Sequence, residues 1–217
     1  MNLAIFDLDN TLLAGDSDHA WGAYLVQQGV VSAEVHATQN DRFYQQYLAG
    51  ALNIHEYVAF VTEPLQRLSF AARERLRKQF VADVITPMIA PGTATLLAQH
   101  RAQGDELIII TATNRFVTEP IAALLAIPHL IATELESDAQ GYTGKIAGVP
   151  AFQDGKITRL NAWLTERDVE FTERYFYSDS HNDLPLLKNV DHPVAVDPDP
   201  TLKTIAEELG WPVITLR

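Results

Sequence analysis

The sequence predicts an α/β protein with a doubly wound parallel sheet at its core and an inserted α-helical cap. Short apolar runs that end in acidic or turn-forming residues recur along the chain, as expected of buried parallel strands. Helical patterns lie between most of these runs, which favours a parallel sheet covered by helices. One long segment near the N-terminus contains only helical patterns and interrupts this alternation.

The expected strands are read from the apolar runs. The first covers residues 2–6 and stops in acidic residues. The other runs lie at 107–110, 175–177 and 194–196, with weaker candidates around Leu130 and Val213. The helical patterns between them cover residues 91–103, 115–125, 156–166 and 201–209. Pro91 opens the first of these helices and Gly210 ends the last, as is usual for helix boundaries.

Two segments depart from the alternation of strands and helices. From Ser17 to Val84 the chain shows helical patterns only, whereas a connection between a strand and a helix needs only a few residues. The expected organisation is therefore a core of residues 1–16 and 85–217 and a helical cap of residues 17–84. Between Ala132 and Gly148, a turn-like stretch precedes a run with strand character, which predicts a β-hairpin.

Composition restricts the classes of partner. The chain of 217 residues has 16 Lys and Arg against 28 Asp and Glu, and its net charge of -12 disfavours nucleic acid and anionic membrane surfaces. It has no cysteine, which excludes disulfides and thiolate catalysis. No run of 18 apolar residues and no signal peptide occurs, so a cytoplasmic protein is expected. The sequence carries no signal for an oligomeric state.

Polar residues that could take part in catalysis or metal binding follow the expected strands. Asp7 and Asp9 come after the first strand, and Asp179 and Asp183 follow a later one. In open α/β sheets, ligands bind outside the carboxyl ends of the strands. Each acid alone is commonly a turn former or a helix N-cap. Gathered at one edge they would repel one another unless a cation held them, and oxygen-rich sites suit Mg²⁺.

These residues resemble the four signatures of the haloacid dehalogenase (HAD) superfamily. The segment from Asp7 to Leu12 is similar to the first signature, Thr111 to the second, Lys156 to the third, and the segment from Asp179 to Asp183 to the fourth. Order and spacing match over nearly the whole chain. The resemblance is greatest to subfamily IB, the phosphoserine-phosphatase-like and histidinol-phosphatase-like branch. It implies a Rossmann-like HAD fold with a C1 cap.

The resemblance also implies an activity and residue roles. The expected enzyme is a Mg²⁺-dependent phosphatase that hydrolyses a small phosphomonoester through an aspartyl phosphate. Asp7 is the expected nucleophile, and Asp9 the acid that protonates the leaving alcohol and then the base that activates water. Thr111 would donate a hydrogen bond to the phosphoryl group. Lys156 would neutralise charge on the phosphate and on Asp7.

The metal and substrate residues are assigned in the same way. Mg²⁺ would be held by Asp7, by the backbone carbonyl of Asp9 and by Asp179, with Asp183 supporting its water ligands. The expected substrate-binding residues are Asp16, Thr113 and Asn182.

The substrate is narrowed by two positions. By its spacing from Asp7, Asp16 matches the acidic residue that receives the substrate amine in phosphoserine phosphatases. An ungapped comparison places Ala59 where those enzymes carry a carboxylate-binding arginine. An amino-alcohol phosphate such as histidinol phosphate is therefore the leading substrate. Phosphoserine remains an alternative if an arginine at position 42, 67 or 115 supplies that contact.

Two other functions stay open. A phosphotransferase or phosphomutase would use the same aspartyl phosphate but pass the group to an acceptor alcohol. A non-catalytic binding protein of the same fold is disfavoured, because such a protein is free to lose Asp7, Asp9, Lys156 and Asp179, all of which are present.

Overall fold

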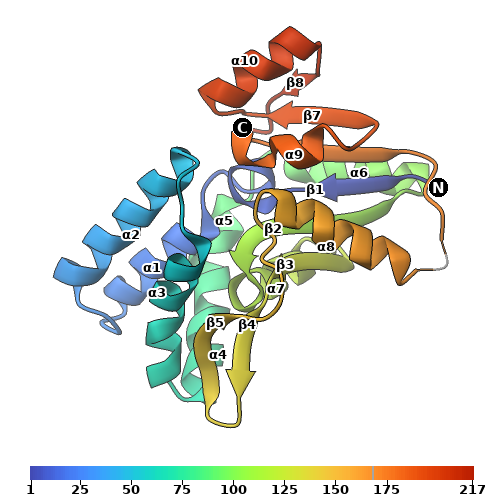
Figure 1. Ribbon diagram of the computed structural model, residues 1–217. Helices are drawn as coiled ribbons and strands as arrows, with labels where there is room; N and C mark the ends of the chain where they lie inside the picture. The colour runs from blue at the N-terminus through green and yellow to red at the C-terminus, as the bar shows by residue number, and fades with distance from the viewer. Residues whose placement is uncertain (168) are drawn as a thin grey trace.

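A six-stranded parallel sheet forms the centre of the molecule, with the strand order β3-β2-β1-β6-β7-β8 (Figure 1). The computed structural model describes residues 1–167 and 169–217. The strands of this sheet are β1 Leu3–Phe6, β2 Glu106–Asn114, β3 His129–Thr133, β6 Arg174–Ser178, β7 His192–Val196 and β8 Val213–Ile214. The expected doubly wound α/β fold is confirmed.

Helices cover both faces of the sheet and form a separate group beside it. The helices of the cap segment are α1 Ser17–Gln27, α2 Ala33–Leu48, α3 Ile54–Arg67 and α4 Phe70–Phe80. The other helices are α5 Thr86–Met88, α6 Thr93–Gln103, α7 Arg115–Leu124, α8 Asp154–Thr165, α9 Leu184–Leu187 and α10 Pro200–Leu209. Three short helical turns complete the list, η1 Leu8–Leu12, η2 Val81–Ile85 and η3 His181–Asp183.

Alternation along the strands divides the apolar core into two layers. In β1, Ala4 and Phe6 pack with residues of α6 and α7 on one face, whereas Leu3 and Ile5 pack with residues of α8, α9 and α10 on the other. All four side chains of β1 are fully buried, because this strand lies at the centre of the sheet between β2 and β6. Burial on both faces explains why the strand is a continuous apolar run.

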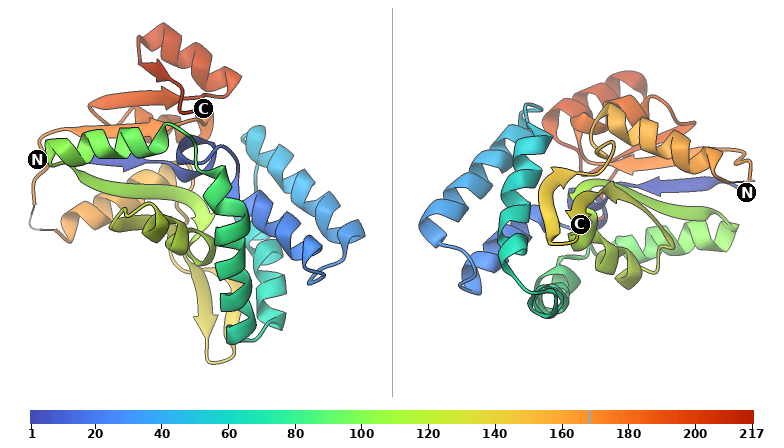
Figure 2. Two further views of the ribbon diagram at one scale, coloured as in Figure 1. Left: turned by 180° about the vertical axis from the view of Figure 1, so that it is seen from behind. Right: turned by 60° about the horizontal axis from the view of Figure 1, so that its bottom comes forward.

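The strand order reverses direction beside β1. The chain adds β2 and β3 on one side of β1 and then returns to add β6, β7 and β8 on the other. Such a switch point leaves a crevice at the carboxyl ends of the central strands, where ligands bind in open α/β sheets. Figures 1 and 2 show helices α1 to α3 standing beyond these strand ends.

The cap segment is helical as expected, and the predicted hairpin packs against it. Strands β4 Leu135–Asp138 and β5 Gly141–Ile146 form the antiparallel pair. The Gln66 side chain on α3 donates to the backbone carbonyl of Tyr142 at 2.9 Å, so the hairpin extends from the sheet to the cap helices. The expected boundary at residues 84 and 85 falls inside η2, where α4 continues into the next helical turn. We propose that residues 17–84 act as the cap.

Strand β2 is longer than the sequence predicts. The apolar run ends at Ile110, but the strand continues to Asn114, with a shift of register against β3 between these two residues. A strand that leaves regular pairing in this way re-aims its side chains.

Within the described residues, no helix has the length and apolar character needed to cross a membrane.

Candidate active site

Buried charged residues meet at the carboxyl ends of the central strands. Asp7 follows β1 directly, and its carboxylate accepts a hydrogen bond from the Lys156 ammonium at 2.8 Å. The same ammonium lies 2.7 Å from the Asp183 carboxylate, which also accepts from the Ser178 hydroxyl at 2.7 Å. Lys156 is in the first turn of α8 and only 2% exposed. The Lys156 ammonium thus joins Asp7, 149 positions before it in the sequence, to Asp183, 27 positions after it.

Electrostatics in this cluster is dominated by burial. Burial raises the pKa of Asp7 to about 7, with Lys156 acting against this rise and Asp183 adding to it. Burial lowers the pKa of Lys156, but the two carboxylates outweigh it and the net shift is upward. Lys156 therefore stays charged at every physiological pH. Truncating it would leave two buried carboxylates unpaired, which is strongly destabilising.

The turn after β1 carries Asp9, which lines one pocket together with Asp7. Helical turn η1 departs from helical geometry at Asp9 and at Asn10, whose φ is 56°. One Asp9 oxygen accepts from the Ser17 backbone N–H at 2.6 Å, and the other accepts from the Thr113 hydroxyl at 2.8 Å. Burial, followed by the charge of Asp16, raises the Asp9 pKa to about 7. A carboxyl group with this pKa can carry a proton near neutral pH and later accept one.

Asp179 is fixed by a reciprocal pair of hydrogen bonds with Thr11. The Thr11 hydroxyl donates to the Asp179 carboxylate and accepts from the Asp179 backbone N–H, both at 3.0 Å. Burial, with Asp7 and Asp183 next, raises the Asp179 pKa well above its ordinary value. Thr11 belongs to the first signature, but no separate role was predicted for it from the sequence.

The donor set fits Mg²⁺. Asp7, Asp179 and Asp183 are all at least 91% buried, and a single ammonium, that of Lys156, is hydrogen-bonded among them. This excess of buried negative charge favours a divalent cation. Among the described residues, no three acidic or histidine side chains are already close enough to hold a metal by themselves. A bound Mg²⁺ would need a backbone carbonyl, waters and phosphate oxygens in addition to these carboxylates.

Replacing Thr11 with valine tests this arrangement. Thr11→Val keeps the shape of the side chain but leaves the Asp179 backbone N–H and one carboxylate oxygen without their partner. We expect a loss of about 1–3 kcal/mol of stability, seen as a lower melting temperature. We also expect roughly 10- to 100-fold weaker Mg²⁺ binding, since residues that orient metal ligands have effects of this size. Calorimetric Mg²⁺ titration of the folded variant measures the second effect, and unchanged affinity would contradict it.

The two threonines of the second signature have different surroundings. The sequence indicated that both follow the strand, but both lie within β2. Thr111 lines the pocket beside Asp7, and its hydroxyl accepts from the Thr113 backbone N–H at 3.2 Å. The hydroxyl of Thr113, predicted to bind substrate, donates to Asp9. The structure therefore gives Thr113 a positioning contact with the expected acid.

Asn182 is bound to the cap. Its side-chain amide donates to the backbone carbonyl of Tyr47 at 3.0 Å, and its oxygen accepts from Gln153 at 3.2 Å. Burial raises the pKa of the Tyr47 hydroxyl well above the ordinary value, and Asp179, Asp7 and Asp183 add to this rise. Tyr47 lies in the last turn of α2, so these contacts join the cap to the loop that carries Asp179. A contact of Asn182 with substrate stays a prediction.

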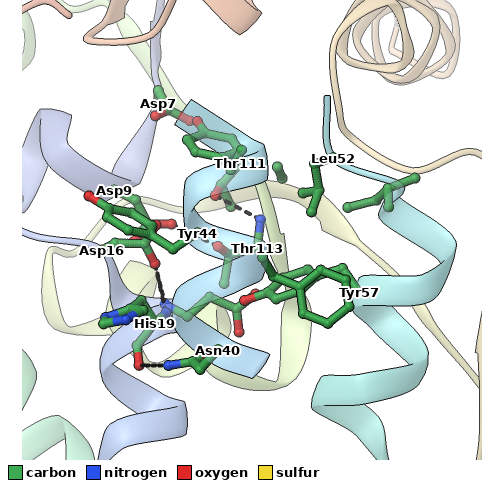
Figure 3. Close-up of a pocket in the computed structure, with 15 residues that line it drawn as sticks. Asp7, Asp9, Asp16, His19, Asn40, Tyr44, Leu52, Tyr57, Thr111 and Thr113 are labelled. Carbon is green, nitrogen blue, oxygen red and sulfur yellow. Dashed lines mark hydrogen bonds between the residues drawn. The ribbon is translucent and has the colours of Figure 1, made fainter. Parts of the chain in front are cut away.

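A pocket of about 520 Å³, its mouth included, lies between this cluster and the cap. Figure 3 shows Asp7 and Thr111 at one end of it and Tyr57 toward the other. Asp16 is the N-cap of α1, where one of its oxygens accepts from the backbone N–H groups of Asp18 and His19 at 2.9 and 2.8 Å. Asp16 thus lines the pocket and begins a helix, and its contact with a substrate amine stays a prediction.

No arginine or lysine is among the described residues that line this pocket. Ala59, the position inferred by ungapped comparison, faces a different depression on the cap. The α3 residues that face the catalytic pocket are Ile54 and Tyr57.

The three arginines considered as alternatives have other partners. Arg42 donates to Gln39, Arg67 pairs with Glu63, and Arg115 pairs with Glu134 at 2.8 Å. None of the three lines the pocket.

Residues 4–188 match the family model described as haloacid dehalogenase-like hydrolase. The chain is 46% identical over 220 residues to a histidinol-phosphatase of Neisseria meningitidis serogroup C, covering 100% of this chain and 99% of that protein. A crystal structure of a protein of unknown function from Bordetella pertussis is 40% identical with a TM-score of 0.92, covering 100% of this chain and 99% of that one. A substrate-bound phosphoserine phosphatase, 15% identical, has the same fold with a TM-score of 0.70 over 100% of this chain and 93% of that one.

The chain belongs to the haloacid dehalogenase-like hydrolase family. The family expected from the four signatures is confirmed, and so is the expectation of an enzyme.

Proposed function

We propose that this protein is a Mg²⁺-dependent phosphomonoesterase that hydrolyses an amino-alcohol phosphate, with histidinol phosphate as the leading substrate. The observation that carries the proposal is the pocket in front of Asp7, which is lined by four carboxylates and, among the described residues, by no arginine or lysine. The chain is a phosphatase of its family, in agreement with the phosphatase activity named for its relative from Neisseria meningitidis.

The first step forms a covalent bond to Asp7. An oxygen of its carboxylate attacks the phosphorus while the ester bond to the leaving oxygen breaks. Protonated Asp9 gives its proton to that oxygen, so that the alcohol leaves neutral. Lys156, 2.8 Å from Asp7, offsets negative charge on the nucleophile and on the phosphoryl oxygens. Thr111, at the Asp7 end of the pocket, would donate its hydroxyl hydrogen to a phosphoryl oxygen.

The second step releases inorganic phosphate. Asp9, now a carboxylate, takes a proton from a water molecule whose oxygen attacks the phosphorus of the aspartyl phosphate. The bond to Asp7 breaks and its carboxylate is restored. The hydrogen bond from Thr113 keeps Asp9 in place through both steps. Bound Mg²⁺, held by Asp7, Asp179 and the Asp9 carbonyl, would supply charge neutralisation for the phosphoryl group.

The charge of the pocket supports a substrate that carries an ammonium group and no carboxylate. Phosphoserine carries a carboxylate, which would meet Asp16 and Asp18 in a lining with no arginine or lysine among the described residues, and like charges in a buried pocket are unfavourable. An amino-alcohol phosphate has an ammonium group and no carboxylate. One oxygen of Asp16 is used by the helix start, and the other would accept from that ammonium group. The charge of Asp16 raises the pKa of Asp9, so the two carboxyl groups are near each other, and an amine bound to Asp16 would be close to the reacting phosphate.

Phosphate release from a substrate panel tests the proposal. The panel contains histidinol phosphate, phosphoserine and common sugar phosphates, with Mg²⁺ and after treatment with a chelator. We expect histidinol phosphate to have the highest kcat/KM and chelation to reduce activity more than about 100-fold, with full recovery on adding Mg²⁺. A higher kcat/KM for phosphoserine would reject the substrate assignment. Transfer of phosphate to an added alcohol, with little free phosphate, would identify a phosphotransferase.

A further inference from the structure

A carboxylate that the mechanism does not use lies at the far end of the pocket. Asp18 is in the first turn of α1, is 4% exposed and lines the same pocket as Asp7. Its carboxylate accepts a long hydrogen bond, 3.4 Å, from the Asn114 amide, and the Tyr57 hydroxyl is near enough for the two groups to affect each other's pKa. Both neighbours are neutral. The charges nearest to it are those of Asp16 and Asp9, which repel it.

Such a residue is unfavourable for folding by itself. Burial, followed by Asp16 and Asp9, raises the pKa of Asp18 well above its ordinary value. The native state therefore binds the proton more tightly than the unfolded chain, and ionised Asp18 destabilises the fold at neutral pH. A buried carboxylate in a ligand pocket, with only neutral partners, is what a site for a hydrogen-bond donor or a cation requires.

The walls beside Asp18 are aromatic and apolar. The rings of Phe43 and Tyr57 meet edge to face with centroids 5.3 Å apart, and both residues line the pocket with Ile54. Asp18, and after it Asp16 and Asp9, raise the pKa of the Tyr57 hydroxyl beyond the effect of burial. For Tyr47 the contributing acids are instead Asp179, Asp7 and Asp183. Tyr57 thus belongs to the end of the pocket away from the nucleophile.

We propose that Asp18, supported by Tyr57, determines specificity by accepting a hydrogen bond from an N–H group on a flat ring of the substrate. This inference rests on the proposed function and deepens it. Asp16 receives the ammonium group near the phosphate, and Asp18 receives the ring N–H, which for histidinol phosphate belongs to the imidazole. The Phe43 and Tyr57 rings enclose that imidazole. Asp16 and Asp18, which are not the catalytic pair, then each accept a hydrogen bond from one nitrogen group of the same substrate.

The test compares two substrates of nearly equal shape. Histidinol phosphate and phenylalaninol phosphate share the ammonium group and the phosphate, but the second has no ring N–H. In Asp18→Asn we expect KM for histidinol phosphate to rise about 10- to 100-fold, the value of one charge-assisted hydrogen bond. We expect kcat to change less than about threefold, and KM for phenylalaninol phosphate to change as little. Tyr57→Phe should shift the same ratio in the same direction, by less.

Controls separate specificity from folding and from net charge. Asp18→Asn should melt at or above the wild-type temperature at pH 7.5, because it removes the unfavourable buried charge; a residue with a merely structural role would lower it. Glu34→Gln makes the same change of charge on the exposed surface of cap helix α2 and should leave both KM values unchanged.

The outcomes distinguish this inference from the proposed function. Equal losses for the two substrates in Asp18→Asn, or a loss confined to kcat, would overturn the role of Asp18 while leaving the phosphatase assignment intact. If the wild-type enzyme released no phosphate from histidinol phosphate, the substrate assignment and this inference would both fall. Isothermal titration with histidinol, the dephosphorylated product, gives a second readout. If histidinol bound to Asp18→Asn as strongly as to the wild type, the inference would also be overturned.

Discussion

Asp7→Asn is expected to lower kcat by roughly 10⁴-fold or more, because an amide oxygen does not form the covalent intermediate and the reaction loses its route. The wild-type enzyme, quenched with acid during turnover, should carry phosphate on the peptide that contains Asp7, and the variant should carry none. Mass spectrometry of the quenched protein detects the adduct. Because Lys156 keeps its contact with Asp183, the variant should remain folded.

A matched control makes this result specific. Asp138→Asn is the same chemical change in the exposed turn of the hairpin, where the side chain accepts from two backbone N–H groups and an amide oxygen can do the same. It should keep wild-type kcat and melting temperature. An Asp7→Asn variant that is folded and retains more than about a tenth of the wild-type kcat would reject Asp7 as the nucleophile.

The sheet could be predicted from sequence because its strands are buried on both faces. Runs such as that of residues 3–6 contain apolar residues only, and the helices between them begin and end at clear signals. The continuation of β2 to Asn114 was not predicted, since the apolar run stops at Ile110 and polar residues follow it. Their place in the strand depends on pairing with β3, which is a long-range contact. Local pattern alone does not contain that information.

The candidate catalytic residues could be proposed from the sequence because each belongs to a short signature, and their roles stay predictions. Their partners could not. Thr11 contacts Asp179, 168 residues away, and Ser178 contacts Asp183, 5 residues away. Thr11 lies in the first signature and its acid in the fourth, whereas Ser178 lies outside both. The cap was harder still. The ungapped comparison selected Ala59, whereas the helix presents Tyr57 to the pocket, because the rotation of a helix about its axis is set by packing and not by spacing from another family.

Asp9→Asn is expected to lower kcat for alkyl phosphates by about 10²- to 10⁴-fold, the usual contribution of a general acid and base. The expected result for p-nitrophenyl phosphate differs, since nitrophenolate leaves without a proton. The first step should then stay fast while the second, which needs Asp9 as a base, stays slow. Stopped-flow absorbance should show a burst of one nitrophenolate per enzyme followed by slow turnover, and no burst of alcohol should appear with an alkyl phosphate.

Thr113→Val is the matched control for this variant. It keeps the Asp9 carboxyl group but removes the hydroxyl that donates to it at 2.8 Å, and that hydrogen bond lowers the Asp9 pKa. Without it the Asp9 pKa should rise further above 7, so that the acid form persists to higher pH and the alkaline decline of activity moves upward. A burst in Thr113→Val, or its absence in Asp9→Asn, would show that the proton passes through another group. The two variants together separate the proton carried by Asp9 from the geometry that Thr113 imposes on it.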